Sequence, residues 1–148
     1  MEQLPEGDTL AVGKRKYLIL DGIGGVPLGR ELFEAFLEAG VPAVHWDALR
    51  QKPRRWYGVA SALYKASNKA GERDGFSHLP RLPLEPLRKL LEDEAPTHVL
   101  VVGFLYKHYD LDQVAVLVRD RGARFMLYDT DSCNLCLLYT SPSPRDAT

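Results

Sequence analysis

The sequence lacks the features that mark membrane proteins, nucleic-acid-binding proteins and disulfide-rich scaffolds. None of its apolar runs approaches the roughly 20 residues needed to cross a bilayer, and its first residues do not form a signal peptide. Its 19 basic and 20 acidic residues leave a net charge of −1, which excludes the broad basic field that attracts nucleic acid. Its two cysteines cannot form a disulfide framework. The 148 residues suit about one domain, and we expect a cytoplasmic protein or a piece of one.

Motifs for common nucleotide and hydrolytic chemistry are also missing. The chain has no Gly-x-x-x-x-Gly-Lys-Ser/Thr loop, no Gly-x-Ser-x-Gly and no His-Glu-x-x-His. The dinucleotide fingerprint starts at Gly22 and Gly24, but Pro27 replaces its third glycine and has no N–H to offer a phosphate. Cys133 and Cys136 have the spacing of half a zinc site, and no second pair completes it. We therefore expect neither a bound cofactor nor a metal.

The end of the chain differs in character from the rest. Residues 136–146 have no helix or strand periodicity and contain two Ser-Pro steps, which favour an extended, unpacked tail. The six residues from Cys136 to Ser141 also resemble a translated transposon-end sequencing adapter. We interpret 136–148 as a non-native disordered tail and expect the natural protein to continue past Leu135.

Strand-like and helix-like segments alternate along the rest of the chain. Two nearly continuous apolar runs, 16–21 and 97–102, are typical of strands buried on both faces. Gly40 is placed to end a helix, and Asp110 is placed to cap one. We expect strands at 16–21, 41–46, 97–102 and 123–128, and helices at 30–39, 56–70, 84–95 and 111–121. This alternation predicts an α/β fold, a doubly wound and mostly parallel Rossmann-like sheet of about four strands with helices on both faces.

Polar and glycine residues gather just past the predicted strand ends, where open parallel sheets bind ligands. A glycine turn follows the first strand, and its backbone either approaches a substrate or only forms a tight turn. His108, after the third strand, is a candidate catalytic base or hydrogen-bond donor. The candidate substrate-binding residues are Gly22, Gly24, Gly25 and Lys107.

The other ionisable candidates each have a structural alternative. Asp129 and Asp131 follow the last strand, and they are catalytic candidates that could bind a cation or take a proton from a hydroxyl group. The alternative for this pair is a turn cap. His45 and His98 lie inside predicted strands, and we interpret them as structural histidines.

Basic and aromatic residues interleave between residues 50 and 74. Seven lysines and arginines stand there against two acids. One hypothesis is contact with a phosphate or an anionic acceptor, and the other is a solvated helix face with aromatic anchors in the core. The interleaved aromatic residues are Trp56, Tyr57 and Tyr64.

Three segments in the second half carry a family resemblance. They are Pro96-Thr-His-Val-Leu-Val-Val-Gly-Phe-Leu105, a helix that ends in Arg-Asp-Arg-Gly122, and Ala123-Arg-Phe-Met-Leu-Tyr-Asp-Thr-Asp131. Together they resemble the N-terminal part of CgeB-like (spore-maturation) glycosyltransferases. In that family an apolar strand is followed by a helix, an Arg-Gly step, a second strand and an acidic turn. This sequence has Thr97 and His98 where an acid is common, and Thr130 separates its two acids.

The resemblance implies a GT-B-like enzyme, built from two Rossmann-like lobes, that moves a sugar from a nucleotide-sugar donor to an acceptor. It implies that residues 14–135 form an incomplete N-terminal, acceptor-side domain after a flexible leader at 1–13. The donor would bind mainly to a C-terminal domain that this fragment lacks, so we expect the isolated fragment to be inactive. The alternative is a non-catalytic Rossmann-like domain that binds a ligand or regulates a partner.

Overall fold

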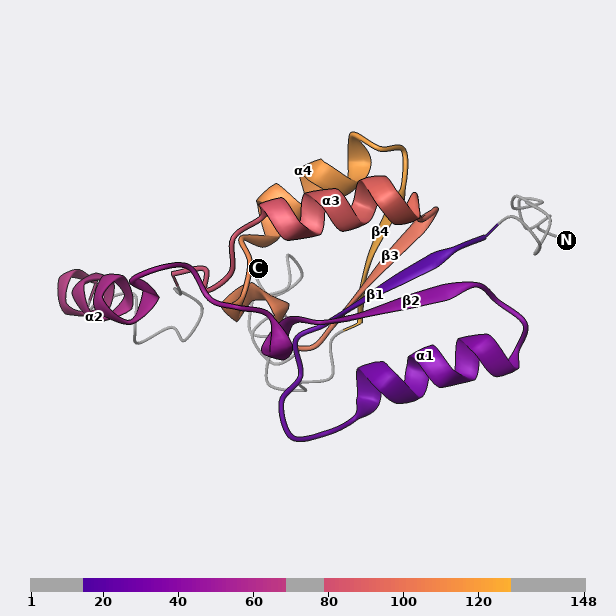
Figure 1. Ribbon diagram of the computed structural model, residues 1–148, viewed down its shortest axis with the longest axis horizontal. Helices are drawn as coiled ribbons and strands as arrows, with labels where there is room; N and C mark the ends of the chain where they lie inside the picture. Colours follow the sequence, from indigo (N-terminus) through magenta and orange to yellow (C-terminus); the bar gives the residue numbers. More distant parts are fainter. Residues whose placement is uncertain (1–14, 69–78, 129–148) are drawn as a thin grey trace, which may run out of the picture.

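Four parallel strands form the centre of the computed structural model, which describes residues 15–68 and 79–128. The strands are β1 (Tyr17–Asp21), β2 (Ala43–Asp47), β3 (His98–Val102) and β4 (Arg124–Tyr128). Their order in the sheet is β2-β1-β3-β4, and every pair is parallel (Figure 1). The predicted α/β, Rossmann-like fold class is confirmed. The expected leader at 1–13 and tail at 136–148 lie outside the described residues.

Helices cover both faces of the sheet. One face carries α1 (Leu28–Glu38), and the other carries α3 (Glu85–Glu94) and α4 (Leu111–Arg119) (Figure 1). The helix α2 (Tyr57–Ser67) extends away from the sheet and buries none of its residues. Two short 3₁₀ turns, η2 (Ala48–Arg50) and η4 (Leu105–Lys107), follow β2 and β3. Among the described residues, no helix is both long and apolar enough to cross a membrane.

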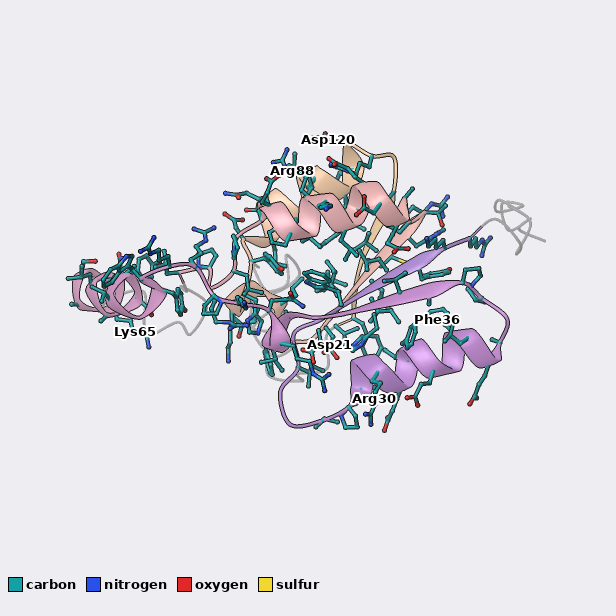
Figure 2. All side chains as sticks on the ribbon, in the orientation of Figure 1. Asp21, Arg30, Phe36, Lys65, Arg88 and Asp120 are labelled. Atoms are coloured by element: carbon teal, nitrogen blue, oxygen red, sulfur yellow. The ribbon has the colours of Figure 1, made fainter. Side chains whose placement is uncertain are left out.

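The main hydrophobic core lies between the central strands and the helices α3 and α4. Apolar side chains of β1 and β3 are fully buried there, as their continuous apolar sequences predict. The other face is covered more thinly, because Gly29 is the only buried residue of α1. On this face lies Phe36 of α1 (Figure 2), whose ring stacks on that of Tyr17 with ring centroids 4.7 Å apart. Buried residues of the main core include Leu18, Leu20, Leu87, Val99, Val101, Val114 and Val118.

The order of the strands reverses direction between β1 and β3, the place where open parallel sheets usually bind ligands. Here the protein itself fills that crevice. A Cβ atom on Gly22 would lie 2.5 Å from the backbone nitrogen of Leu105, and one on Gly103 would clash with the Ile23 side chain. The loops after β1 and β3 therefore pack closely against each other, and Gly22 and Gly103 permit this close approach because they have no side chain.

This contact gives a direct test of the fold. Gly22→Ala should lower the free energy of unfolding by about 1–3 kcal/mol, because backbone atoms of Phe104 and Leu105 must move to admit the methyl group. Gly58→Ala is the matched control, since it lies in α2 with open space around it and should be neutral or stabilising by up to about 1 kcal/mol. Urea unfolding curves measure both values. Equal stabilities for the two variants would contradict this close packing of the two loops.

Candidate functional site

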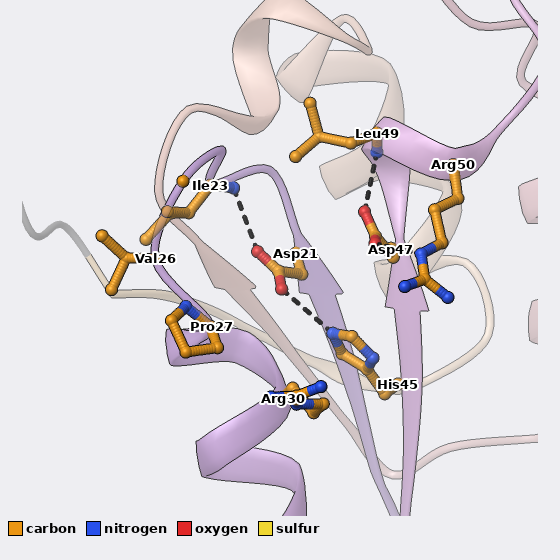
Figure 3. A pocket seen from close by; sticks show the side chains of 10 residues that line it. Asp21, Ile23, Val26, Pro27, Arg30, His45, Asp47, Leu49 and Arg50 are labelled. Atoms are coloured by element: carbon orange, nitrogen blue, oxygen red, sulfur yellow. Dashed lines mark hydrogen bonds and ion pairs between the residues drawn. The ribbon is translucent and has the colours of Figure 1, made fainter.

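A pocket of about 450 Å³ opens beside the carboxyl ends of β1 and β2, next to the first turn of α1 (Figure 3). It lies on the neighbouring strand pair, away from the filled crevice between β1 and β3. Two acidic, two basic and one imidazole side chain line it, together with apolar residues of the β1–α1 loop. The lining residues are Asp21, Ile23, Gly25, Val26, Pro27, Arg30, His45, Asp47, Leu49 and Arg50.

The centre of this pocket is a hydrogen-bonded pair of side chains from neighbouring strands. Asp21 is only 5% exposed, and its Oδ2 lies 3.0 Å from Nε2 of His45, while its Oδ1 accepts a hydrogen bond from the Ile23 N–H at 3.0 Å (Figure 3). Its carboxylate also occupies the space that a Cβ atom on Gly29 would need. The β1–α1 loop and the first turn of α1 therefore fix the carboxylate in one position.

The partner of His45 determines which ring nitrogen carries the proton. An ionised carboxylate can only accept, so an imidazole that is neutral donates its Nε2–H to an ionised Asp21 in this geometry. Nδ1 is then the unprotonated nitrogen with a free electron pair. The side chain of His45 is 19% exposed and lines the pocket. This arrangement gives the pocket a positioned base.

The carboxylates and guanidinium groups of the pocket balance each other when Asp21 is counted with them. Asp47 accepts a hydrogen bond from the Leu49 N–H at 2.9 Å, and its Oδ2 lies 3.3 Å from Nε of Arg50. Arg30 enters from α1 and forms an exposed pair with Glu34. With two carboxylates against two guanidinium groups, the pocket suits a polar, hydroxyl-bearing ligand better than a highly charged one.

The three glycines predicted to bind substrate have different environments. Gly25 lines the pocket and has a positive φ of 86°, which favours glycine. Gly22 packs against the η4 turn, and Gly24 lies near Leu49. The sequence indicated polar residues past the strand ends without singling out Asp21 or Asp47, and we interpreted His45 as a structural histidine. The missing signal was the register, which pairs His45 with Ile19 and so places it on the same face of the sheet as Asp21.

The other predicted residues do not reach this pocket. Lys107 and His108 line a second, smaller pocket beneath α2. Asp129 and Asp131 lie outside the described residues, and their predicted roles stay predictions. Across 15–68 and 79–128, no three His, Cys, Asp or Glu side chains come together in a way that could hold a metal ion.

His108 is the one predicted catalytic residue whose environment is described. It is 6% exposed, and its Nδ1 lies 3.1 Å from Nε of Arg81, which always donates. Burial lowers the pKa of His108 to about 4, helped by the positive charges of Arg81 and Lys107 and opposed by Asp47. The imidazole is therefore neutral at pH 7 with its proton on Nε2. Of the two predicted roles, the geometry favours the hydrogen-bond donor.

Comparison with known proteins adds no family to this description. Neither the family models, the curated proteins nor the solved structures contain a match to this chain.

The lowered pKa of His108 predicts how stability changes with pH. In the unfolded chain the group has a pKa near 6.5, so between pH 6.5 and 4 the unfolded state binds a proton that the folded state does not. Stability is full above pH 6.5 and should fall by about 3 kcal/mol as the pH drops to 4. His98, whose pKa burial also lowers, adds to this loss.

His108→Gln should flatten part of this pH dependence, whatever it does to stability at pH 7. Urea unfolding at several pH values between 4 and 7.5 measures the slope for the wild type, for His108→Gln and for His98→Gln. An unchanged slope in His108→Gln, or a nuclear magnetic resonance titration of His108 near pH 6.5, would contradict its buried neutral state.

Proposed function

We propose that this chain is the acceptor-binding lobe of a GT-B-like glycosyltransferase, similar to the CgeB-like enzymes, and that His45 activates the acceptor. The observation that carries the proposal is the Asp21–His45 pair inside the pocket at the carboxyl edge of the sheet. A base whose second nitrogen is held by a buried carboxylate is the usual arrangement for deprotonating a hydroxyl group.

The proposed reaction uses this pair in one displacement. Nδ1 of His45 accepts the proton of an acceptor hydroxyl as the hydroxyl oxygen attacks the anomeric carbon of the donor sugar. The bond between that carbon and the nucleoside diphosphate breaks, and the diphosphate leaves with the bonding electrons. Asp21 keeps the imidazole in the required tautomer and stabilises the imidazolium that forms. The second lobe implied by the resemblance would hold the nucleotide.

The shape of the pocket supports an acceptor here in preference to a nucleotide. Pro27 lines the pocket where a phosphate-binding loop would offer an N–H, and the crevice between β1 and β3 is filled. The balanced charges beside His45 fit a neutral, hydroxyl-rich molecule. A non-catalytic ligand-binding domain is the alternative, favoured by the fact that all described lining residues of the pocket come from this one lobe.

The proposal includes a second lobe, so the role of His45 is tested in a two-lobe protein whose gene encodes this chain together with that lobe. Transfer from a panel of nucleotide sugars to hydroxyl acceptors is measured for the wild type, His45→Gln and His98→Gln. His45→Gln should lower kcat by about 10²–10⁴-fold, because it removes the base. His98→Gln, at the opposite end of the sheet, should leave kcat unchanged. Equal activity of all three proteins would exclude His45 as the base.

The 148-residue chain itself should not consume nucleotide sugars. One lobe cannot orient donor and acceptor together, and that orientation supplies much of the rate. Chromatography of UDP-, GDP- and dTDP-sugars incubated with the chain measures any turnover. Transfer by this chain would refute the two-lobe proposal, whereas binding without transfer by the two-lobe protein would favour the ligand-binding alternative.

A further inference from the structure

A second pocket, of about 170 Å³, lies between α2, the segment that follows residue 78, and the η4 turn. These three segments are far apart in the sequence and are joined by hydrogen bonds near the start of α2. The Arg54 N–H donates to the Arg81 carbonyl at 2.9 Å, and the Tyr57 hydroxyl donates to the Leu79 carbonyl at 3.3 Å. The lining residues are Tyr57, Ser61, Tyr64, Lys65, Leu79, Arg81, Lys107 and His108.

Three cations line this second pocket, and no carboxylate is among its described lining residues. Lys65, Arg81 and Lys107 carry three positive charges, and Ser61 adds a hydroxyl donor. In the described parts of the chain, none of the three cations forms an ion pair with a carboxylate. Lys107 instead lies 4.7 Å from the ring centroid of Phe104. The carboxylate of Asp47 acts on His108 from outside this pocket, so the charge of the three cations is compensated only in part.

Arg81 is held in place by three hydrogen bonds. Its Nε donates to His108, and its two terminal nitrogens donate to the backbone carbonyls of Ala48 and Gln51. A guanidinium group has five N–H donors, and acceptors among the described residues take three of them. Because Nδ1 of His108 accepts the hydrogen bond from Arg81, the neutral imidazole carries its proton on Nε2 and can donate from there. A rigid guanidinium beside two lysines matches the three oxygens of a phosphoryl group.

We propose that this second pocket binds the phosphoryl group of a small molecule. Its volume is below the roughly 300 Å³ at which pockets for whole drug-sized ligands begin, so it would hold one charged group and leave the rest of the ligand outside. A phosphoryl dianion would neutralise two of the three cations. The chain as a whole carries a net charge of −1, which favours a small anion over a nucleic acid strand. This inference is independent of the proposed function, because it uses no residue of the first pocket.

The test uses the 148-residue chain and titrates inorganic phosphate, glycerol 3-phosphate and a hexose 6-phosphate while amide resonances are recorded. Shifts should be concentrated at residues 57–65 and 107–108. Lys65→Gln and Lys107→Gln should each weaken binding about 10-fold, because each removes one charge-assisted hydrogen bond. Both lysines are exposed, so the variants should keep the fold. Lys89→Gln, the same change on an exposed residue of α3, should bind like the wild type.

Each outcome decides the proposal. Tighter binding of a phosphate ester than of inorganic phosphate supports a phosphorylated metabolite as the ligand, and equal binding supports free phosphate. Unchanged affinity in both lysine variants, or a response to single-stranded RNA with none to the small phosphates, overturns it. His45→Gln should bind phosphate like the wild type, so failure of the sugar-transfer proposal leaves this result intact.

Discussion

The buried carboxylate of Asp21 is the constraint around which the first pocket is built. An ionised group at 5% exposure costs several kcal/mol unless hydrogen bonds replace its water. The Ile23 N–H satisfies one oxygen, and this bond shapes the loop that carries Gly25 and Pro27 to the pocket. His45 satisfies the other oxygen and is thereby oriented on the neighbouring strand. Gly29 completes the arrangement, because α1 can approach the carboxylate only where no side chain intervenes.

The short η2 turn connects this pocket to the second one. Leu49 and Arg50 of η2 line the first pocket, while the carbonyl of Ala48 accepts a hydrogen bond from Arg81 of the second. Arg81 also binds the Gln51 carbonyl just after the turn. The Arg81 guanidinium therefore holds the backbone of residues 48–51, which lies between the two pockets. The position of Arg81 depends in turn on the segment 79–82, which is hydrogen-bonded to Tyr57 of α2.

Local signals in the sequence were enough to predict the parallel sheet, and they predicted the helix ends to within three residues. Gly40 has a positive φ of 73° directly after α1, and Asp110 accepts hydrogen bonds from the N–H groups of Asp112 and Gln113 at the start of α4. The sites depend on non-local contacts. The strand register brings His45 to Asp21, and the packing of residues 79–82 on η2 and η4 brings Arg81 to His108. Neither contact leaves a periodic pattern in the sequence.

Two histidines of the same chain have opposite hydrogen-bonding roles because their partners carry opposite charges. His45 faces a carboxylate, donates from Nε2 and keeps an electron pair on Nδ1. His108 faces a guanidinium, accepts at Nδ1 and keeps a proton on Nε2. The first arrangement suits taking a proton from a neutral hydroxyl group, and the second suits donating a hydrogen bond to an anion. The chemistry of each pocket therefore follows from one charged neighbour, Asp21 in the first and Arg81 in the second.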